Sequence, residues 1–309
     1  MAAFNNILQL AQKFNTEEKC REYLEQLRWP NGEPACPFCG SLKVYRYANG
    51  RTLRCGEKEC KKKFSVTVGT IFENTKIPLQ KWFIAIFLIS SHKKGISSLQ
   101  LSRDLGITQK SAWFIAHRVR EMLKAKAPSL LTGEIEIDET YIGGAEKNKH
   151  AHKRTPKTQG RSTKTKQPVL GILQRDGEVY ALPVAKTTAK ELLPIMVGKV
   201  EPGSQIFTDE WTAYKSLAKN YAHQIVKHGH GEYVNGIAHT NNIEGFWSLL
   251  KRGIVGIYHQ VSPKHLHRYC DEFAYRYNTR KTAEPVRFED AISQCDGRRL
   301  KYNQLIAQK

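Results

Sequence analysis

The stretch Glu134-Ile135-Glu136-Ile137-Asp138 alternates acidic and aliphatic side chains. Because successive residues of a β-strand point to opposite faces, the alternation predicts a strand over 134–142 with the acids on one face and the isoleucines on the other. Further strands are predicted over 168–175, 178–185, 204–209 and 223–228, and helices over 187–199, 212–219, 241–252 and 263–278. Asp176-Gly177 is typical of a hairpin turn. Together these elements predict a mixed α/β sheet.

Three carboxylates stand at informative places in this pattern. Asp138 and Asp209 each end a predicted strand, and Glu244 lies near the start of a predicted amphipathic helix. Two strand-end aspartates and a helical glutamate can converge on two divalent cations, which activate a water or a 3′ hydroxyl in phosphodiester transfer. Lys251 follows Glu244 by seven residues and therefore shares its helix face. The spacing alone is equally compatible with an ion-pair network. Acidic residues next to Asp138 and Asp209 could bind a metal in their place, so the choice of metal ligands stays open. These residues are Glu134, Glu136 and Glu210.

The composition favours a polyanionic partner. The 309 residues include 49 Lys and Arg against 29 Asp and Glu, which gives a net charge of +20. Basic side chains that neutralise phosphates release condensed counterions, so nucleic acid is the first candidate, against a basic protein without such a ligand. The first twenty residues lack the apolar core of a signal peptide, and the longest apolar run is far shorter than a membrane span. The sequence therefore predicts a cytoplasmic protein that is not bound to a membrane.

Four of the seven cysteines form two pairs that bracket a hairpin-like segment with Asn49-Gly50 at its tip. These cysteines are Cys36, Cys39, Cys55 and Cys60. Four thiolates complete a tetrahedral zinc shell, and a closed shell makes the site structural, so the pattern predicts a zinc ribbon with one Zn²⁺. The alternative is four unligated thiols or a redox pair.

The segment 96–120 has the pattern of a helix-turn-helix. Gly106 supplies the turn between two helical stretches, and Thr108 can cap the second helix. The residues of the second helix predicted to contact DNA bases or phosphates are Lys110, Ser111, Trp113, His117, Arg118 and Arg120. A helical hairpin without a DNA-binding role has the same pattern.

The segment 146–167 is rich in Lys and Arg and almost without apolar residues. Such a segment cannot bury enough surface to fold by itself, which predicts a basic loop. Beside a phosphoryl-transfer site it could clamp a DNA backbone, although a solvated insertion has the same composition.

Four motifs resemble those of ISXO-like bacterial insertion-sequence transposases. They are Asp138-Glu139-Thr140-Tyr141-Ile142-Gly143-Gly144, the segment 207–214 around Asp209, the segment 239–253 around Glu244, and the segment 262–280. The cysteine module resembles the zinc ribbon of the same family. The resemblance covers nearly the whole chain in long, ordered motifs.

The resemblance implies an RNase H-like catalytic core and a Mg²⁺-dependent DNA transposase. Asp138, Asp209 and Glu244 would hold two Mg²⁺ ions, and Lys251 and Arg252 would contact DNA, with Asn241 or Asn242 as the alternative third ligand. The active complex would contain at least two copies, because two transposon ends must be handled together. The implied domains are an N-terminal helical segment (1–35), the zinc ribbon (36–64), the helix-turn-helix segment (65–128), the core (129–285) and a C-terminal tail (286–309). The rival hypotheses are an inactive zinc-dependent DNA-binding regulator and a nuclease that cleaves without joining.

Overall fold

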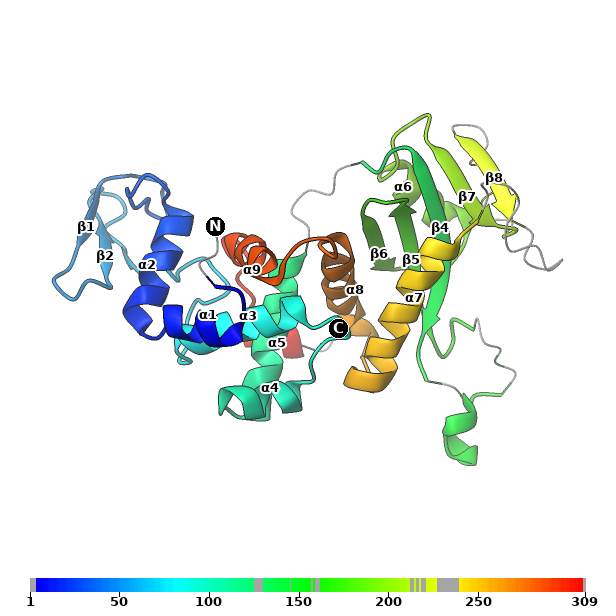
Figure 1. Ribbon diagram of the computed structural model, residues 1–309, viewed down its shortest axis with the longest axis horizontal. Coiled ribbons are helices and arrows are strands. Elements are labelled where there is room, and N and C mark those ends of the chain that lie inside the picture. The colour runs from blue at the N-terminus through cyan, green and yellow to red at the C-terminus, as the bar shows by residue number, and fades with distance from the viewer. Residues whose placement is uncertain are drawn as a thin grey trace. The chain divides into compact units, whose positions relative to one another are not determined.

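The computed structural model describes residues 4–124, 130–144, 146–156, 158, 162–211, 214, 217, 221–226 and 239–307. The chain divides into two compact units (Figure 1). Unit 1 comprises Met1–His92, Ile96–Leu123 and Thr282–Lys309, and unit 2 comprises Lys93–Gly95 and Lys124–Lys281.

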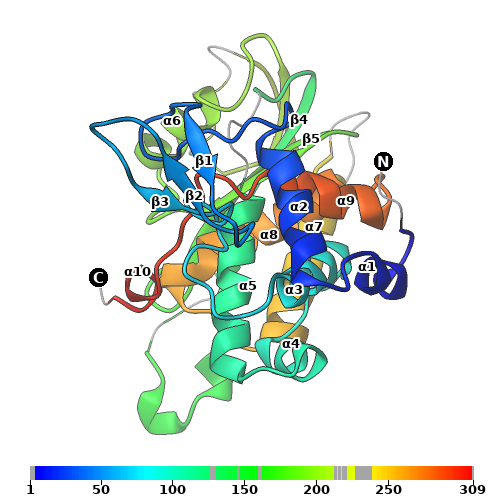
Figure 2. The same ribbon diagram turned by 90° about the vertical axis from the view of Figure 1, so that its left-hand side faces the viewer.

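Unit 1 is mainly helical. Its helices are α1 (Ile7–Lys13), α2 (Glu17–Arg28), α3 (Leu79–Ser91), α4 (Ser98–Leu105), α5 (Gln109–Leu123), α9 (Glu284–Ser293) and α10 (Tyr302–Ile306). The core contains aromatic rings in edge-to-face contact, with centroids 4.8 Å apart for Phe14 and Phe83 and 5.7 Å apart for Phe83 and Phe288. Phe288 belongs to α9, which packs against α3 (Figures 1 and 2). The segment 286–309, predicted as a tail, therefore contributes two helices and part of the core to unit 1.

A small antiparallel sheet carries the cysteine module. Its strands are β1 (Val44–Arg46), β2 (Leu53–Cys55) and β3 (Lys63–Phe64), paired in that order (Figure 2). The side chain of Asn49 accepts hydrogen bonds of 3.0 Å from the N–H groups of Arg51 and Thr52, which closes the loop between β1 and β2. The predicted hairpin between the two cysteine pairs is confirmed.

Helices α4 and α5 form the predicted pair joined by a tight turn. Gly106 has φ 57°, a left-handed conformation that glycine adopts without the steric cost of a β-carbon. The hydroxyl of Thr108 accepts a hydrogen bond of 3.3 Å from the N–H of Ser111, as predicted for the cap of the second helix.

Unit 2 is built on a five-stranded mixed sheet. Its strands are β4 (Glu134–Ile142), β5 (Gln167–Gln174), β6 (Val179–Pro183), β7 (Gln205–Asp209) and β8 (Ala222–Val226). The order is β6-β5-β4-β7-β8, with antiparallel pairing among the first three strands and parallel pairing of β7 with β4 and β8. This is the strand order of an RNase H-like sheet. The five predicted strands and the mixed α/β fold are confirmed.

Helices cover both faces of this sheet, as the alternation in β4 requires. Ile135 and Ile137 are fully buried in a core that includes Leu192 and Met196 of α6 (Ala189–Val197). The opposite face packs against α7 (Asn241–Gly253) and α8 (Pro263–Asn278). Glu136 and Asp138 therefore face α7 while the isoleucines face α6. Figure 1 shows β4 with α6 and α7 in unit 2. A π-helical turn, Ile254–Tyr258, follows α7 directly.

Two of the predicted segments are described only in part by the structure. In the basic segment 146–167, the described residues form two 3₁₀ turns, Glu146–Asn148 and Ala151–Lys153, both without buried residues. Of the predicted helix 212–219, only Tyr214 and Leu217 are described, and both are buried. Within the described ranges, no helix is long and apolar enough to cross a membrane.

Candidate active site

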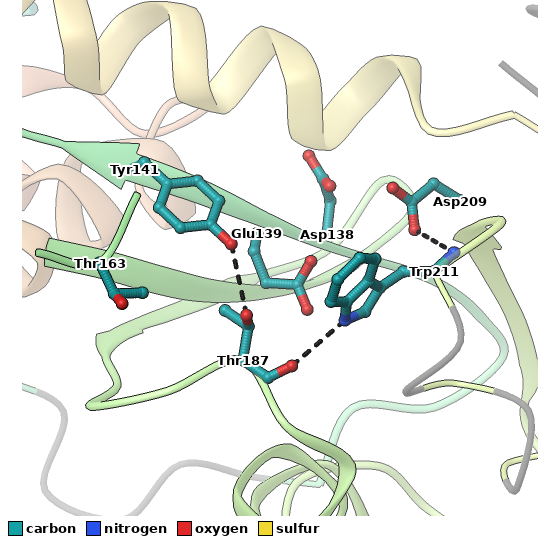
Figure 3. Close-up of a pocket in the computed structure, with 7 residues that line it drawn as sticks. All are labelled: Asp138, Glu139, Tyr141, Thr163, Thr187, Asp209 and Trp211. Atoms are coloured by element: carbon teal, nitrogen blue, oxygen red, sulfur yellow. Dashed lines mark hydrogen bonds between the residues drawn. The ribbon is translucent and has the colours of Figure 1, made fainter. Parts of the chain in front are cut away.

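Asp138 and Asp209 lie side by side on neighbouring parallel strands. The register pairs Glu134 with Gln205 and Glu136 with Phe207, and its continuation places Asp138 next to Asp209. Asp209 is the last residue of β7, and its carboxylate accepts a hydrogen bond of 3.0 Å from the N–H of Trp211. Figure 3 shows the two carboxyl groups at the edge of one pocket. The sheet thus brings together two acids that are 71 residues apart in sequence.

The proximity of the two acids is visible in the electrostatics of Asp138. Burial, together with the negative charge of Asp209, raises the pKa of Asp138 to about 6, and Glu244 contributes in the same direction. A cation bound between the carboxylates would remove this repulsion, and carboxylate oxygens are the ligands that Mg²⁺ prefers. The donor set therefore fits a hard divalent cation.

Glu244 reaches this region from α7. It lies in the first turn of the helix and is exposed, and it contributes to the electrostatic field at Asp138. Lys251 and Arg252 lie in the last turn and are also exposed. The three carboxylates are not within 4.8 Å of one another in the way that a preformed metal cluster would be.

Trp247 connects α7 to Asp138. Its indole N–H donates a hydrogen bond of 3.0 Å to Asp138 Oδ2. Gly171 of β5 lies opposite Asp138 in the antiparallel ladder, and a β-carbon there would come within 2.5 Å of the Trp247 ring. The absence of a side chain at this position makes space for the indole. Neither Trp247 nor Gly171 was predicted from the sequence to have a role at the site.

The pocket beside the two aspartates is lined by aromatic and hydroxyl side chains. Its lining residues are Asp138, Glu139, Tyr141, Thr163, Thr187, Asp209 and Trp211 (Figure 3). The indole N–H of Trp211 donates to the Thr187 carbonyl at 3.2 Å, and the hydroxyl groups of Tyr141 and Thr187 are 3.3 Å apart. On the far side of β4, the buried Tyr214 hydroxyl donates to Glu139. Burial and the Glu139 charge raise the pKa of Tyr214, which keeps it protonated.

The four cysteines of unit 1 converge on one point. Their sulfur atoms all lie within 4.8 Å of one another, with Cys36 Sγ 3.7 Å from Cys60 Sγ and Cys39 Sγ 3.5 Å from Cys55 Sγ. Four sulfurs about 2.3 Å from a tetrahedral zinc ion would be about 3.8 Å apart. Although burial raises the pKa of Cys36, hydrogen bonds from backbone N–H groups at positions 38 and 39 lower it to about 7, whereas burial and the neighbouring thiols raise the pKa values of Cys39 and Cys55. The cluster fits a structural zinc ion.

Two family models match the chain, one on each of these sites. Residues 130–278 match the ISXO2-like transposase domain, and residues 15–63 match the transposase zinc-ribbon domain. A protein of the transposable element ISH50 from Halobacterium salinarum is 31% identical over 251 residues, which are 77% of this chain and 83% of that protein. The chain belongs to the ISXO2-like transposase family. The resemblance found in the sequence motifs is confirmed, and so is the zinc ribbon.

Other relatives of this transposase are more distant. A transposase-like protein from Haemophilus influenzae is 28% identical over 102 residues, covering 33% of this chain and 81% of that protein. Among solved structures, the Mos1 strand transfer complex has 11% identity, a TM-score of 0.29, and coverage of 65% of this chain and 74% of that chain. A pre-cleavage Mos1 transpososome has a TM-score of 0.19 and 12% identity over 65% of this chain and 75% of that chain.

The structure corrects part of the predicted DNA-binding surface. His117, Arg118 and Arg120 are buried, at most 5% exposed, so they are not placed to contact phosphates. The second half of α5 is enclosed within unit 1, and the guanidinium group of Arg118 donates to the carbonyl groups of Ile71, Glu73 and Leu300. Arg118 thus links three segments of unit 1.

The remaining predicted DNA contacts lie near the start of α5 and at the end of α7. Lys110 is exposed, Ser111 and Trp113 are partly exposed, and Arg252 is exposed on α7. The ammonium group of Lys110 lies 5.2 Å from the centre of the Tyr302 ring. These four side chains remain accessible to a ligand of the transposase.

Proposed function

We propose that the protein is a Mg²⁺-dependent DNA transposase that cleaves the ends of an insertion sequence and joins them to target DNA. The observation that carries the proposal is the pair Asp138 and Asp209, set on adjacent strands with the pKa of Asp138 raised to about 6. The pair lies within the segment that matches the transposase domain. Within the described part of the chain no basic side chain forms an ion pair with either carboxylate, and two adjacent acids of this kind are suited to a divalent cation.

The catalytic ligands are proposed to be Asp138, Asp209 and Glu244. Two Mg²⁺ ions held there would activate a water and then a 3′ hydroxyl, and would stabilise the leaving oxygen. Trp247 fixes the direction of the Asp138 carboxylate by its hydrogen bond to Oδ2. Lys251 and Arg252, exposed on the same helix as Glu244, are proposed to bind the phosphates of the transposon end.

Glu244 is favoured over Asn242 as the third ligand by the contacts of the asparagine. The side-chain amide and the backbone N–H of Asn242 both donate to the carboxylate of Glu136, at 2.9 and 3.0 Å. These contacts direct Asn242 toward β4 and occupy it there. Glu244 is exposed, as Asn242 is, but it carries a negative charge. An acid next to two other acids is the stronger ligand for a doubly charged cation.

The other modules are proposed to bind DNA. The zinc ribbon and the start of α5, with Lys110, Ser111 and Trp113, would recognise the transposon end, since the first residues of a recognition helix meet the base edges. The basic segment 146–167 would clamp the DNA backbone. At least two copies would act together, because one transposition event joins two ends.

The test is strand transfer by the purified protein on duplex DNA that carries the inverted repeats flanking its own gene. Joined products should require Mg²⁺ and should be lost in Asp209→Asn, while end binding is retained. Glu210→Gln is the matched control, since this neighbouring acid is exposed and is not among the acids that line the pocket. Joined products made by Asp209→Asn at the rate of Glu210→Gln would contradict the proposed ligand set, and cleavage without joining would indicate a nuclease.

A further inference from the structure

A carboxylate that the sequence analysis left unassigned is fully buried two residues before Asp138. Glu136 has no exposed surface. Its Oε1 accepts hydrogen bonds of 2.9 Å from Arg175 Nε and from the Asn242 side chain, and its Oε2 accepts bonds of 3.0 Å from the backbone N–H groups of Asn242 and Ile243. His239 Nδ1 lies 3.2 Å from Oε1. Glu136 thus joins β4 to the N-terminus of α7, where unpaired N–H groups favour a negative charge.

Arg175, the ion-pair partner of Glu136, connects β4 and α7 to the neighbouring strand β7. The Arg175 Nη1 atom lies 3.2 Å from Glu134 Oε2, and Nη2 donates to the His239 carbonyl at 2.9 Å. The guanidinium carbon lies 4.0 Å from the centre of the Phe207 ring in β7. Only 11% of the Arg175 side chain is exposed. The ion pair therefore contacts β4, β7 and the first turn of α7 at once.

Three residues that form or contact this ion pair are each close in sequence to one of the proposed metal ligands. Glu136, Phe207 and Asn242 each lie two residues before one of them, and those acids are Asp138, Asp209 and Glu244. In a strand, residues two apart share a face, so fixing the first also fixes the direction of the second. At the start of α7, the two N–H bonds to Glu136 fix the first helical turn, which contains Glu244.

We propose that the Glu136–Arg175 ion pair positions the three acids relative to one another. This inference rests on the proposed function of those acids as metal ligands. Neither member of the pair would contact the cations or the DNA, so both are positioning residues. Stability alone does not explain this ion pair well, because the free energy needed to remove two charges from water is about as large as the free energy of their attraction. Metal ligands, in contrast, depend on the partners that hold them.

The first test compares Glu136→Gln with Glu272→Gln. Glu272 is also fully buried in unit 2, where it is paired with Arg276 on α8 and accepts a hydrogen bond from Tyr258, 14 residues after Glu244 in the sequence. Mn²⁺ binding to the DNA-free protein, measured by electron paramagnetic resonance, should weaken about tenfold or more in Glu136→Gln, the loss expected for a charged hydrogen bond. The amide hydrogens of Asn242 and Ile243 should exchange faster with solvent in this variant. Glu272→Gln should leave both quantities unchanged.

The second variant is Glu136→Gln/Arg175→Met, which leaves no uncompensated buried charge. Its melting temperature should be close to that of the wild type, yet Mn²⁺ binding and strand transfer should remain weakened. Wild-type Mn²⁺ affinity in this stable variant would overturn the positioning role. If wild-type protein binds Mn²⁺ but joins no DNA, the proposed transposase activity is wrong. The Mn²⁺ affinities of the variants then still test the positioning role of the ion pair. If wild-type protein binds no Mn²⁺, both proposals are overturned.

Discussion

The indole nitrogen of Trp247 donates a hydrogen bond of 3.0 Å to Asp138 Oδ2. This contact joins α7, which carries Glu244, to β4, which carries Asp138. A carboxylate with one oxygen held by a donor on another element has a fixed direction. The contact depends on Gly171, which lies opposite Asp138 and makes space for the indole ring.

Trp247→Phe should reduce strand transfer without unfolding the protein. Phenylalanine keeps the apolar contacts of the ring but removes the donor to Asp138, which costs about 1.5–3 kcal/mol for a bond to a charged group. We expect a loss of about tenfold or more in the transfer rate, measured at saturating Mg²⁺. Trp82→Phe is the control, since its indole N–H donates a comparable bond of 2.9 Å to Thr75 in unit 1. Equal rates for the two variants would contradict a role of the Trp247 bond in catalysis.

Gly171→Ala should destabilise the core of unit 2. The added β-carbon would lie 2.5 Å from the Trp247 ring and 2.9 Å from Ile243, so α7 must shift. Overpacking of this kind costs about 1–3 kcal/mol, measurable by urea unfolding. Gly245→Ala, on the open side of α7, adds a β-carbon that would meet no atom of the described residues within 4 Å, and it should be neutral or stabilising by up to about 1 kcal/mol. The same stability for both alanine variants would show that α7 does not depend on the close approach to Gly171.

Mg²⁺ binding should weaken as the pH falls through about 6. Burial and the charge of Asp209 raise the pKa of Asp138 to about 6 in the metal-free protein, so below this pH a proton competes with the cation, by about tenfold per pH unit. The stability of the metal-free fold has the opposite dependence. The folded state holds this proton more tightly than an unfolded Asp with a pKa near 3.8, so the contribution of Asp138 is fully present below that value and is lost as the pH rises through 6. Calorimetric titration should show the trend in wild type and lose it in Asp138→Asn. An affinity independent of pH in the wild type would contradict the assignment.

The sequence predicted the strands and helices of unit 2 well because their periodicity is strong. The acids and isoleucines of β4 alternate without interruption, and α7 has a clear apolar stripe, so the elements that carry Asp138 and Glu244 lie close to where they were predicted. The helices of the C-terminal segment were not predicted. Phe288 becomes a core residue only because α9 packs against α3. Its contact with Phe83 joins residues about two hundred positions apart, and no local pattern in the sequence predicts it.

The supporting residues of the site could not be predicted for a similar reason. Glu136 shares a face with Asp138, which alternation shows, but its role depends on Arg175, 39 residues later, and on the N-terminus of α7. Charged residues on a predicted recognition helix are ordinarily exposed, so Arg118 was assigned to phosphate contacts. Its actual partners, the carbonyl groups of Ile71 and Leu300, belong to distant segments.

Removal of one cysteine ligand should release zinc. In Cys55→Ser the tetrahedral shell loses a thiolate, and elemental analysis should find no bound zinc together with weaker binding to transposon ends. Cys20→Ala is the matched control, because Cys20 is buried in unit 1 but lies outside the cluster. Equal zinc content in the two variants would contradict the four-cysteine site.

Two basic residues of α5, Lys110 and Arg118, should respond in opposite ways to substitution. Arg118 is 5% exposed, its guanidinium group donates to three backbone carbonyls, and burial lowers its pKa to about 10. Arg118→Ala leaves these carbonyls without donors and should cost about 2–5 kcal/mol of unfolding free energy. Lys110→Ala removes an exposed charge and one contact with the Tyr302 ring, worth at most about 1 kcal/mol.

Lys110→Ala should instead weaken DNA binding at low salt and reduce the salt dependence of the affinity by about one unit. Arg118→Ala, measured at a temperature where it is folded, should keep the wild-type salt dependence. The measurement is fluorescence anisotropy of labelled transposon-end DNA over a range of salt concentrations, with urea unfolding of the same preparations. If the substitution of Arg118 lowered the salt slope while the unfolding free energy stayed unchanged, Arg118 would be a phosphate contact after all, and the correction drawn from its burial would be wrong.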